Sequence, residues 1–209
     1  MDGMHDGNLL TDAAALKALY GEPSEPAVAK EIDYVHPHYR AMIEAAPFMV
    51  MATSGPDGLD VSPRGDPPGF VVVEDDKTLL IPDRRGNNRC DSLNNLIDDP
   101  RIALLFMIPG VGETLRVNGQ AEICIDPELL ARFPAQGKLP RSVIVVHVER
   151  VYFQCPKALV RSDLWNPAKK VERRGLPSSG TILADVSRGR VGGVEYDAAY
   201  PERLKATIY

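Results

Sequence analysis

A short basic turn carries the clearest chemistry in the sequence. Residues 83–89 read Asp-Arg-Arg-Gly-Asn-Asn-Arg, between a predicted strand and a predicted helix. Guanidinium groups are planar charged donors suited to phosphate oxygens, and a helix N-terminus adds free N–H groups. Gly86 lets the backbone approach a ligand. The turn matches neither a P-loop nor a dinucleotide fingerprint, so it predicts the phosphate site of a mononucleotide or, alternatively, a solvated basic turn.

A second segment, residues 60–69, interrupts a strand with proline and glycine. Pro63 has no backbone donor, and the glycines and prolines that follow it prevent a regular ladder. Such an edge exposes backbone polar groups to a ligand. Ser62 and Arg64 are therefore expected to point toward an anion or the edge of a ring. The alternative is an ordinary edge strand with a surface arginine.

Other side chains give weaker signals. The single tryptophan, Trp165, follows the last predicted strand and suits the cover of a planar cofactor, a dimer interface or plain packing. His36 and His38 lack the thiols and carboxylates that would complete a metal site, and His147 is expected to be structural. No metal site is predicted. No catalytic residue can be assigned, because no acid–base carboxylate pair and no G-x-S-x-G elbow is present.

Short apolar or alternating segments bounded by turn residues predict strands. The clearest is 114–125, where apolar and polar residues alternate strictly, so that one face is buried. At least six strands within residues 48–155 predict a closed or partly closed antiparallel barrel. The expected strands cover residues 48–53, 59–62, 69–73, 78–81, 101–107, 114–125 and 143–153.

Three helices are expected around these strands. One ends at Gly21 after a cap at Thr11 or Asp12, before a proline-marked linker. A second covers residues 38–46 and stops at Pro47. The third covers residues 88–97, with Leu93, Leu96 and Ile97 on one face. Asn87 or Asn88 is its expected N-cap. The segment from Val171 onward is expected to be an irregular or partner-wrapping arm.

Composition places limits on partners and location. The net charge is -5, so general nucleic-acid binding is not expected, and an anionic ligand needs a local basic cluster. The odd set of three cysteines indicates reduced thiols. The start of the chain is polar and no apolar run reaches the length of a membrane span. A cytoplasmic protein without membrane contact is therefore expected.

Taken together, the motifs resemble those of the pyridoxamine 5′-phosphate oxidase-like superfamily, most closely its branch of FMN-dependent proteins. The resemblance covers about residues 38–166. It rests on several ordered motifs, which are Ser-Pro-Arg-Gly-Asp at 62–66, Pro-Gly-Phe at 68–70, Pro-Asp-Arg-Arg-Gly-Asn-Asn-Arg at 82–89, Leu-Arg-Val-Asn-Gly at 115–119 and Cys-Pro-Lys-Ala-Leu-Val-Arg-Ser-Asp-Leu-Trp at 155–165.

The resemblance implies a mainly β (α+β) fold, a six-stranded antiparallel split β-barrel with a few flanking helices. It also implies a homodimer with FMN at the subunit interface. In that frame, residues 1–35 form a helical extension, residues 36–166 the FMN-binding barrel and residues 167–209 a C-terminal arm.

Individual positions carry over from the same resemblance. Asn87, Asn88 and Arg89 fall where the family grips the phosphate, with Arg84 or Arg85 supplying a charge that Asn88 lacks. The remaining positions lie along the flavin, beside its ring or at the partner's side. These cofactor contacts are Ser62, Pro63 and Arg64, then Pro82 and Asp83, and finally Thr114, Arg116 and Trp165.

The expected function is that of an FMN-dependent oxidoreductase acting on an unidentified small molecule, with NADH or NADPH as a candidate donor. Arg64 is the candidate that stabilises reduced flavin. The oxidase's C-terminal substrate signature is absent from residues 166–209, which argues against pyridoxamine phosphate as substrate. The alternatives are a flavin carrier, store or sensor without turnover, and the same barrel holding haem or a deazaflavin.

Overall fold

The computed structural model of the chain describes residues 9–209. The chain divides into two compact units, Met1–Glu31 and Ile32–Tyr209. In the first, α1 (Ala13–Tyr20) begins at Asp12, whose carboxylate accepts a 2.7 Å bond from the Ala15 N–H, and ends at Gly21, as predicted. The predicted linker is wrong in part, because it contains the short α2 (Glu25–Ala29), which tolerates its proline in the first turn.

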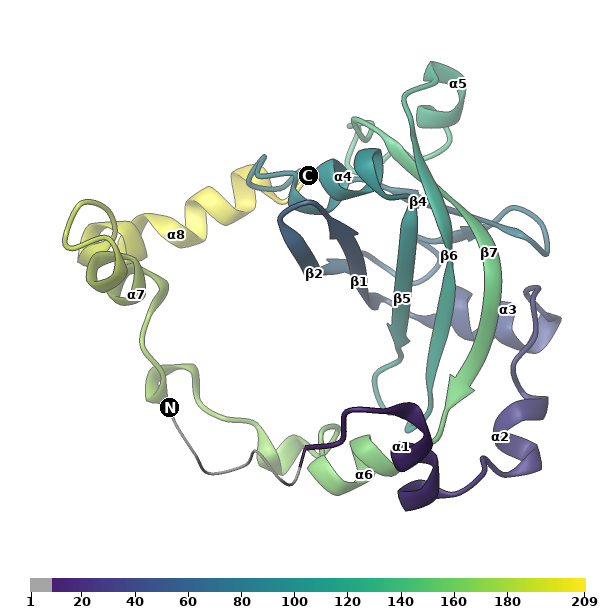
Figure 1. Cartoon of the computed structure of the whole chain (residues 1–209). Coiled ribbons are helices and arrows are strands. Elements are labelled where there is room, and N and C mark those ends of the chain that lie inside the picture. Colours follow the sequence, from purple (N-terminus) through teal and green to yellow (C-terminus); the bar gives the residue numbers. More distant parts are fainter. Residues whose placement is uncertain (1–8) are drawn as a thin grey trace. The chain divides into compact units, whose positions relative to one another are not determined.

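The second unit is built on one antiparallel sheet (Figure 1). Its strands are β1 (Phe48–Gly55), β2 (Gly58–Gly65), β3 (Val72–Val73), β4 (Thr78–Pro82), β5 (Arg101–Met107), β6 (Thr114–Cys124) and β7 (Val143–Gln154). The helices are α3 (Pro37–Ala45), α4 (Asp91–Asp98), α5 (Pro127–Leu130), α6 (Lys157–Ser162), α7 (Ser179–Val186) and α8 (Gly193–Thr207), with 3₁₀ turns at Pro167–Lys169 and Arg173–Gly175.

The order of the strands makes this sheet a split barrel. They run β2-β1-β5-β6-β7-β4-β3, so β2 and β3 are the two edges of a curled but unclosed sheet. The predicted class, a mainly β split barrel with flanking helices, is confirmed. Six strands carry the barrel, and the seventh, β3, has only two residues. The edges of β2 and β3 are not paired with each other and leave a seam in the barrel.

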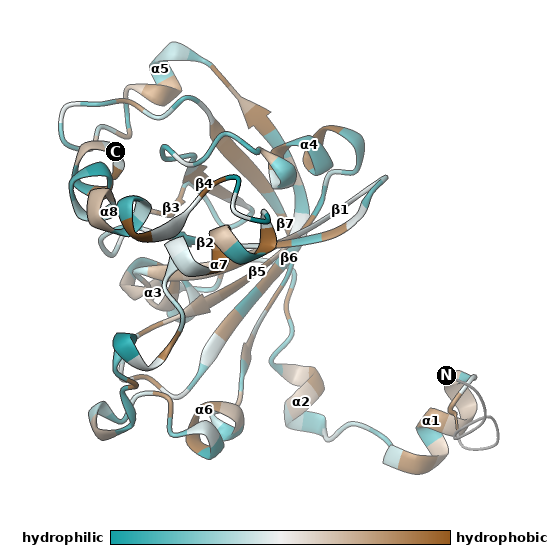
Figure 2. Cartoon of the chain, turned by 90° about the vertical axis from the view of Figure 1, so that its left-hand side faces the viewer, coloured by the Kyte–Doolittle hydropathy of each residue, from teal (hydrophilic) through white to brown (hydrophobic). Residues whose placement is uncertain are grey.

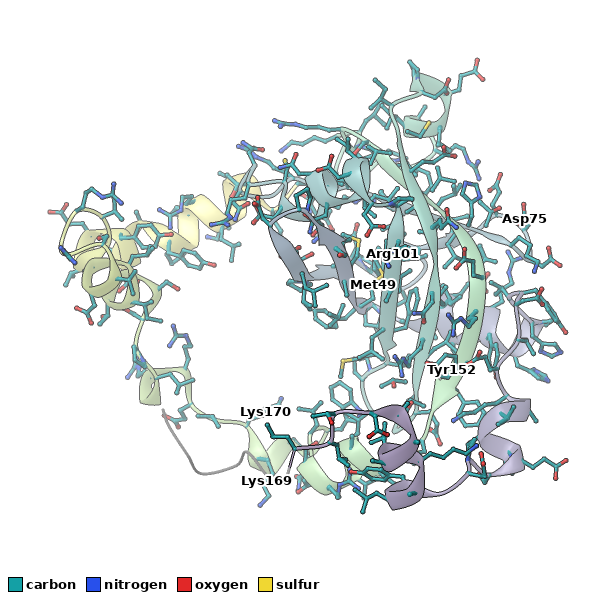
Figure 3. All side chains as sticks on the ribbon, viewed as in Figure 1. Met49, Asp75, Arg101, Tyr152, Lys169 and Lys170 are labelled. Atoms are coloured by element: carbon teal, nitrogen blue, oxygen red, sulfur yellow. The ribbon has the colours of Figure 1, made fainter. Side chains whose placement is uncertain are left out.

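Alternation along the strands separates a core from an outer face. Met49 and Met51 on β1, Leu104 on β5 and Val117 on β6 are nearly fully buried. Figure 2 shows the apolar stretches concentrated on the strands, and Figure 3 labels Met49 among them. The residues between these point outward, so Val50 of β1 pairs with Leu105 of β5 on the outer face.

The two longest strands, β6 and β7, are joined across an irregularity. Their register shifts between Asn118 and Gly119. A Cβ built on Gly119 would lie 2.0 Å from the carbonyl oxygen of His147. Glycine is therefore required here because the two backbones approach too closely for any side chain.

Two predicted elements near the seam are corrected. The helix expected at 88–97 begins only at Asp91, because Asn88 and Cys90 adopt left-handed φ angles of 61° and 58°. Neither Asn87 nor Asn88 is its N-cap. The strand expected at 69–73 is reduced to Val72–Val73, since Gly69 has φ 88° and breaks the extended run.

The predicted irregular arm is also corrected, because it contains two helices. Ser178 caps α7 by accepting from the Thr181 N–H, and Asp197 of α8 accepts from the Gly180 N–H at 2.7 Å. A Cβ on Gly180 would lie 2.3 Å from the oxygen of Gly193, so glycine allows the helices to meet. The predicted domain boundaries at 35 and 166 stay predictions.

Candidate functional site

A cavity of about 800 Å³ lies at the open seam of the barrel. Its walls come from the end of β2, the end of β4, the basic turn after it, the start of α4, the loop at 135–142 and the last two residues of the arm. The structure thus brings together most of the predicted ligand contacts, which are Ser62, Pro63, Arg64, Pro82, Asp83, Arg84, Arg85, Asn87, Asn88 and Arg89.

The cavity is positively charged although the chain is acidic. Six cationic and three carboxylate side chains line it, giving a side-chain formal charge of +3 in a protein of net charge -5. Converging donors of one sign in a concave site favour an anionic ligand. The cations are Arg64, Arg84, Arg85, Arg89, Lys138 and Arg141, and the carboxylates are Asp60, Asp83 and Asp91.

Arg84 is held by the protein itself. Its Nε donates to Oδ2 of Asp66 at 2.7 Å, and its Nη1 donates to the carbonyl oxygen of Phe133 at 2.7 Å. The Asp66 side chain is only 3% exposed. Because a buried carboxylate needs a partner, Arg84 serves first to satisfy Asp66. Arg85, which is exposed, is the better placed of the two to supply a charge.

The predicted phosphate grip forms a small network of its own. Asn87 accepts a 3.0 Å bond from the Arg89 N–H, and Asn88 accepts one of 3.2 Å from Nη1 of Arg141. The Arg89 guanidinium pairs with Asp91 at 2.8 Å, and this hydrogen bond raises the pKa of Arg89. The pair is exposed and contributes little to stability, so an anionic ligand can compete with Asp91 for this side chain.

Arg64 ends a chain of hydrogen bonds that begins at Asp60. Ser92 donates to Oδ2 of Asp60 at 2.5 Å. Its only hydroxyl proton is thereby used, so the 2.8 Å bond between Ser62 and Ser92 must be donated by Ser62. Arg64 Nη1 in turn donates to Ser62 Oγ at 2.9 Å. Each hydrogen bond in this series is therefore donated in the direction of Asp60, and the series fixes the guanidinium of Arg64.

The same guanidinium has a buried donor without a partner. Its Nε is buried and, within residues 9–209, has no hydrogen-bond partner. Leaving a charged donor unsatisfied costs free energy unless a ligand pairs with it. Asp83 also lines the cavity, and burial raises its pKa, opposed by the charges of Arg64 and Arg141. The site therefore combines an unpaired cationic donor with a carboxyl group that is easier to protonate than usual.

Three predicted contacts lie elsewhere. Thr114 and Arg116 line a second cavity of about 510 Å³ on the outer face of β1, β5 and β6. The Trp165 indole N–H donates to the carbonyl oxygen of Val111 at 2.7 Å. Within one chain, none of the three lines the basic cavity. Their contact with the same ligand would require a second copy of the chain and stays a prediction.

Several lining residues were not predicted as ligand contacts. Asp60 lay within the segment already singled out, but its link to Ser92 joins a strand to a helix. Lys138 and Arg141 belong to a loop without a motif, and Tyr209 reaches the cavity from the end of the arm. Only their proximity in the fold reveals them.

The family model for pyridoxamine 5'-phosphate oxidase matches residues 35–155, more than half of the chain. The chain belongs to the pyridoxamine 5'-phosphate oxidase family. No curated protein matches it. The match to this oxidase family spans all seven strands and the basic turn, while α7, α8 and Tyr209 lie beyond it.

Solved structures resemble the same region. HupZ of Group A Streptococcus is 22% identical, with 56% of this chain and 90% of HupZ covered and a TM-score of 0.46. An FMN-binding protein from Syntrophomonas wolfei is 13% identical, with 55% and 82% covered and a TM-score of 0.43.

Two further findings describe the surroundings of the site. Among residues 9–209, no group of three or more histidine, cysteine or acidic side chains is arranged to hold a metal ion. Within the same residues, every helix is too short or too polar to cross a bilayer.

Proposed function

We propose that the protein binds FMN in the basic cavity and acts as an FMN-dependent oxidoreductase on a small molecule. The observation that carries the proposal is the buried, unpaired Nε of Arg64 in a cavity of side-chain formal charge +3. Such a donor fits an anionic or strongly accepting ligand. Membership of the pyridoxamine 5'-phosphate oxidase family supports a flavin as that ligand.

Different parts of the cavity would hold different parts of the cofactor. The phosphate would bind at the basic turn, where Asn87, Asn88 and Arg89 lie together with the exposed Arg85. The ring would lie along the β2 edge at 62–64 and beside Pro82 and Asp83. The cavity volume falls within the range of roughly 300–1,000 Å³ that is usual for small-molecule sites.

The bound flavin would supply the electron or hydride transfer, and the protein would supply binding, orientation and charge. Arg64 is held by a hydrogen bond to Ser62, and its buried Nε has no partner among residues 9–209. Its positive charge favours an electron-rich ring. Asp83, whose pKa is raised by burial, is the carboxyl group in the cavity best suited to hold or release a proton.

We also infer a homodimer, because the outer face of the barrel is apolar and open. Val50 and Ala52 of β1 and Leu105 of β5 line the second cavity together with Thr114 and Arg116. The guanidinium carbon of Arg116 lies 5.0 Å from the centre of the Tyr152 ring, and Figure 3 labels that tyrosine. Covering this face with a second copy would bury apolar surface and would bring Thr114 and Arg116 toward a ligand of that copy.

The decisive experiment compares FMN with riboflavin on the purified protein. The proposal expects flavin absorption bands and an affinity for FMN at least tenfold above that for riboflavin, because only FMN carries the phosphate. Equal affinities would remove the basic turn as a phosphate site. A Soret band in the absorbance spectrum would indicate haem instead.

Turnover is tested separately. Steady consumption of NADH or NADPH by the FMN-loaded protein supports the oxidoreductase. Flavin binding without reduction by either donor would favour a carrier or sensor. The three cysteines, Cys90, Cys124 and Cys155, are all free thiols, which fits the proposed cytoplasmic location.

A further inference from the structure

The end of the C-terminal arm forms part of the cavity wall. Ile208 and Tyr209 line the cavity beside residues of the basic turn and α4. These two residues lie outside the region matched by the family model, so the core family motif does not account for their position.

Specific bonds hold Tyr209 in that position. Its phenol donates to Oδ1 of Asp66 at 2.5 Å, and this hydrogen bond raises the pKa of Tyr209. Lys138 Nζ donates to the main-chain oxygen of Tyr209 at 2.7 Å. The guanidinium of Arg84 lies 5.9 Å from the centre of the tyrosine ring. Asp66 thus binds Arg84 with one oxygen and Tyr209 with the other.

The cavity keeps its volume of about 800 Å³ with Tyr209 in place. Tyr209 is therefore a wall of the site and does not fill it. The bonds that hold it are few, and the Lys138 side chain that supplies one of them is exposed. A wall fixed by two hydrogen bonds and one cation–π contact can open locally without disturbing the barrel.

We propose that Tyr209, latched to Asp66 and Lys138, is a hinged wall that closes the cavity behind its ligand and slows the ligand's release. The inference rests on the proposed binding of FMN in this cavity. Opening the latch would free both Lys138 and the phenol, and closing it would place the tyrosine ring against the bound molecule. The arm that carries Tyr209, through α8, then belongs to the binding site.

The first test measures the rate at which bound FMN leaves, by trapping released FMN with an excess of a flavin-binding apoprotein. Tyr209→Ala removes both the ring that forms the wall and the hydroxyl that binds Asp66, and it is expected to speed release about tenfold. Tyr209→Phe keeps the ring and is expected to have a smaller effect. Tyr200→Phe on α8 is the matched control, because Tyr200 does not line the cavity, and its release rate should equal that of the wild type.

The second test needs no ligand. Hydrogen exchange of α8 in the free protein should be faster in Tyr209→Phe and Tyr209→Ala than in the wild type or Tyr200→Phe. Unchanged exchange in both Tyr209 variants would overturn the latch even if FMN binds. If wild-type protein fails to bind FMN while exchange responds as expected, the latch stands and the choice of ligand is wrong. Release from Tyr209→Ala within twofold of the wild-type rate would overturn the role in retention.

Discussion

The Ser92 hydroxyl donates a 2.5 Å hydrogen bond to Oδ2 of Asp60, which joins the first turn of α4 to the edge strand β2. Ser92 is 4% exposed, so water cannot easily replace Asp60 as the acceptor of its hydroxyl proton. Because this bond uses the only hydroxyl proton of Ser92, it fixes the orientation of Ser62 and then of Arg64. The carboxylate of Asp60 thereby positions a guanidinium that it does not touch.

Ser92→Ala is therefore expected to weaken FMN binding by about 1 kcal/mol, the usual contribution of one hydrogen bond. The measurement is a titration with FMN, with Ser162→Ala as control, since Ser162 is an exposed serine whose hydroxyl donates to the Leu159 carbonyl oxygen. If Ser92 acts through Arg64, Ser92→Ala should have no further effect in an Arg64→Ala background. Additive losses would show an independent role.

Arg89→Ala is expected to weaken FMN binding by about 1.5–3 kcal/mol, because a charge-assisted bond to the phosphate is lost. Riboflavin binding should not change. Arg101→Ala is the matched control, because Arg101 also forms an exposed pair with an aspartate two residues away. Both variants should unfold at the same urea concentration as the wild type. Unchanged FMN affinity would move the phosphate toward Arg85 and Arg141.

Asp83→Asn tests the buried carboxyl group. Burial raises the pKa of Asp83, so the folded state holds its proton more tightly than the unfolded chain, whose pKa is about 3.9. The stabilising contribution of Asp83 is thus fully present below the pKa of the unfolded chain and is lost as pH rises through the pKa of the folded state. At still higher pH the stability no longer changes with this group. We expect Asp83→Asn to stabilise the protein near pH 7 by no more than about 1 kcal/mol, because partial exposure and Arg64 screen the charge.

The check is urea unfolding at several pH values between 3.5 and 7. Asp99→Asn is the control of opposite sign, because a hydrogen bond from Arg101 lowers the pKa of Asp99. Because Asp99→Asn removes this stabilised carboxylate, the variant should be less stable than the wild type at pH values above the pKa of the unfolded chain. An Asp83→Asn variant that is less stable than the wild type at pH 7 would contradict the raised pKa.

The barrel could be predicted from sequence because its signals are local. The expected strand at 101–107 coincides with β5, and that at 114–125 exceeds β6 by one residue. Strict alternation leaves only one register that buries the apolar face. The start of α4 was missed because Asn88 and Cys90 take left-handed angles, a conformation that no period in the sequence reveals.

The site was predictable only where its residues share a motif. The segments at 62–64 and 82–89, which the motifs single out, both line the cavity, and their contact with a ligand stays a prediction. The motif predicts Arg84 as a ligand contact, but the fold buries its carboxylate partner, Asp66, beside it. The hydrogen bond between Tyr209 and Asp66 joins residues 143 positions apart in the sequence. Contacts of such separation depend on tertiary packing alone.

Leu105→Asp tests the proposed dimer. Leu105 is half-buried in one chain and lines the apolar outer cavity, so a carboxylate there would be desolvated by a second copy at a cost of several kcal/mol. Sedimentation or light scattering should show a dimer for the wild type and a monomer for the variant. Ile125→Asp, at a 72% exposed position beyond β6, is the control. A wild type that is already monomeric at micromolar concentration would refute the interface.

Gly119→Ala addresses the close approach of β6 and β7. The added methyl group would lie 2.0 Å from the His147 carbonyl oxygen, and backbone must move to admit it. Overpacking of this kind costs about 1–3 kcal/mol, and here the strain falls where the register shifts beside the core. Gly175→Ala is the control, because a Cβ there meets nothing within 4 Å. Equal urea midpoints for the two variants would mean that the irregularity between β6 and β7 can accommodate a side chain. The close approach of these strands would then not explain the glycine at position 119.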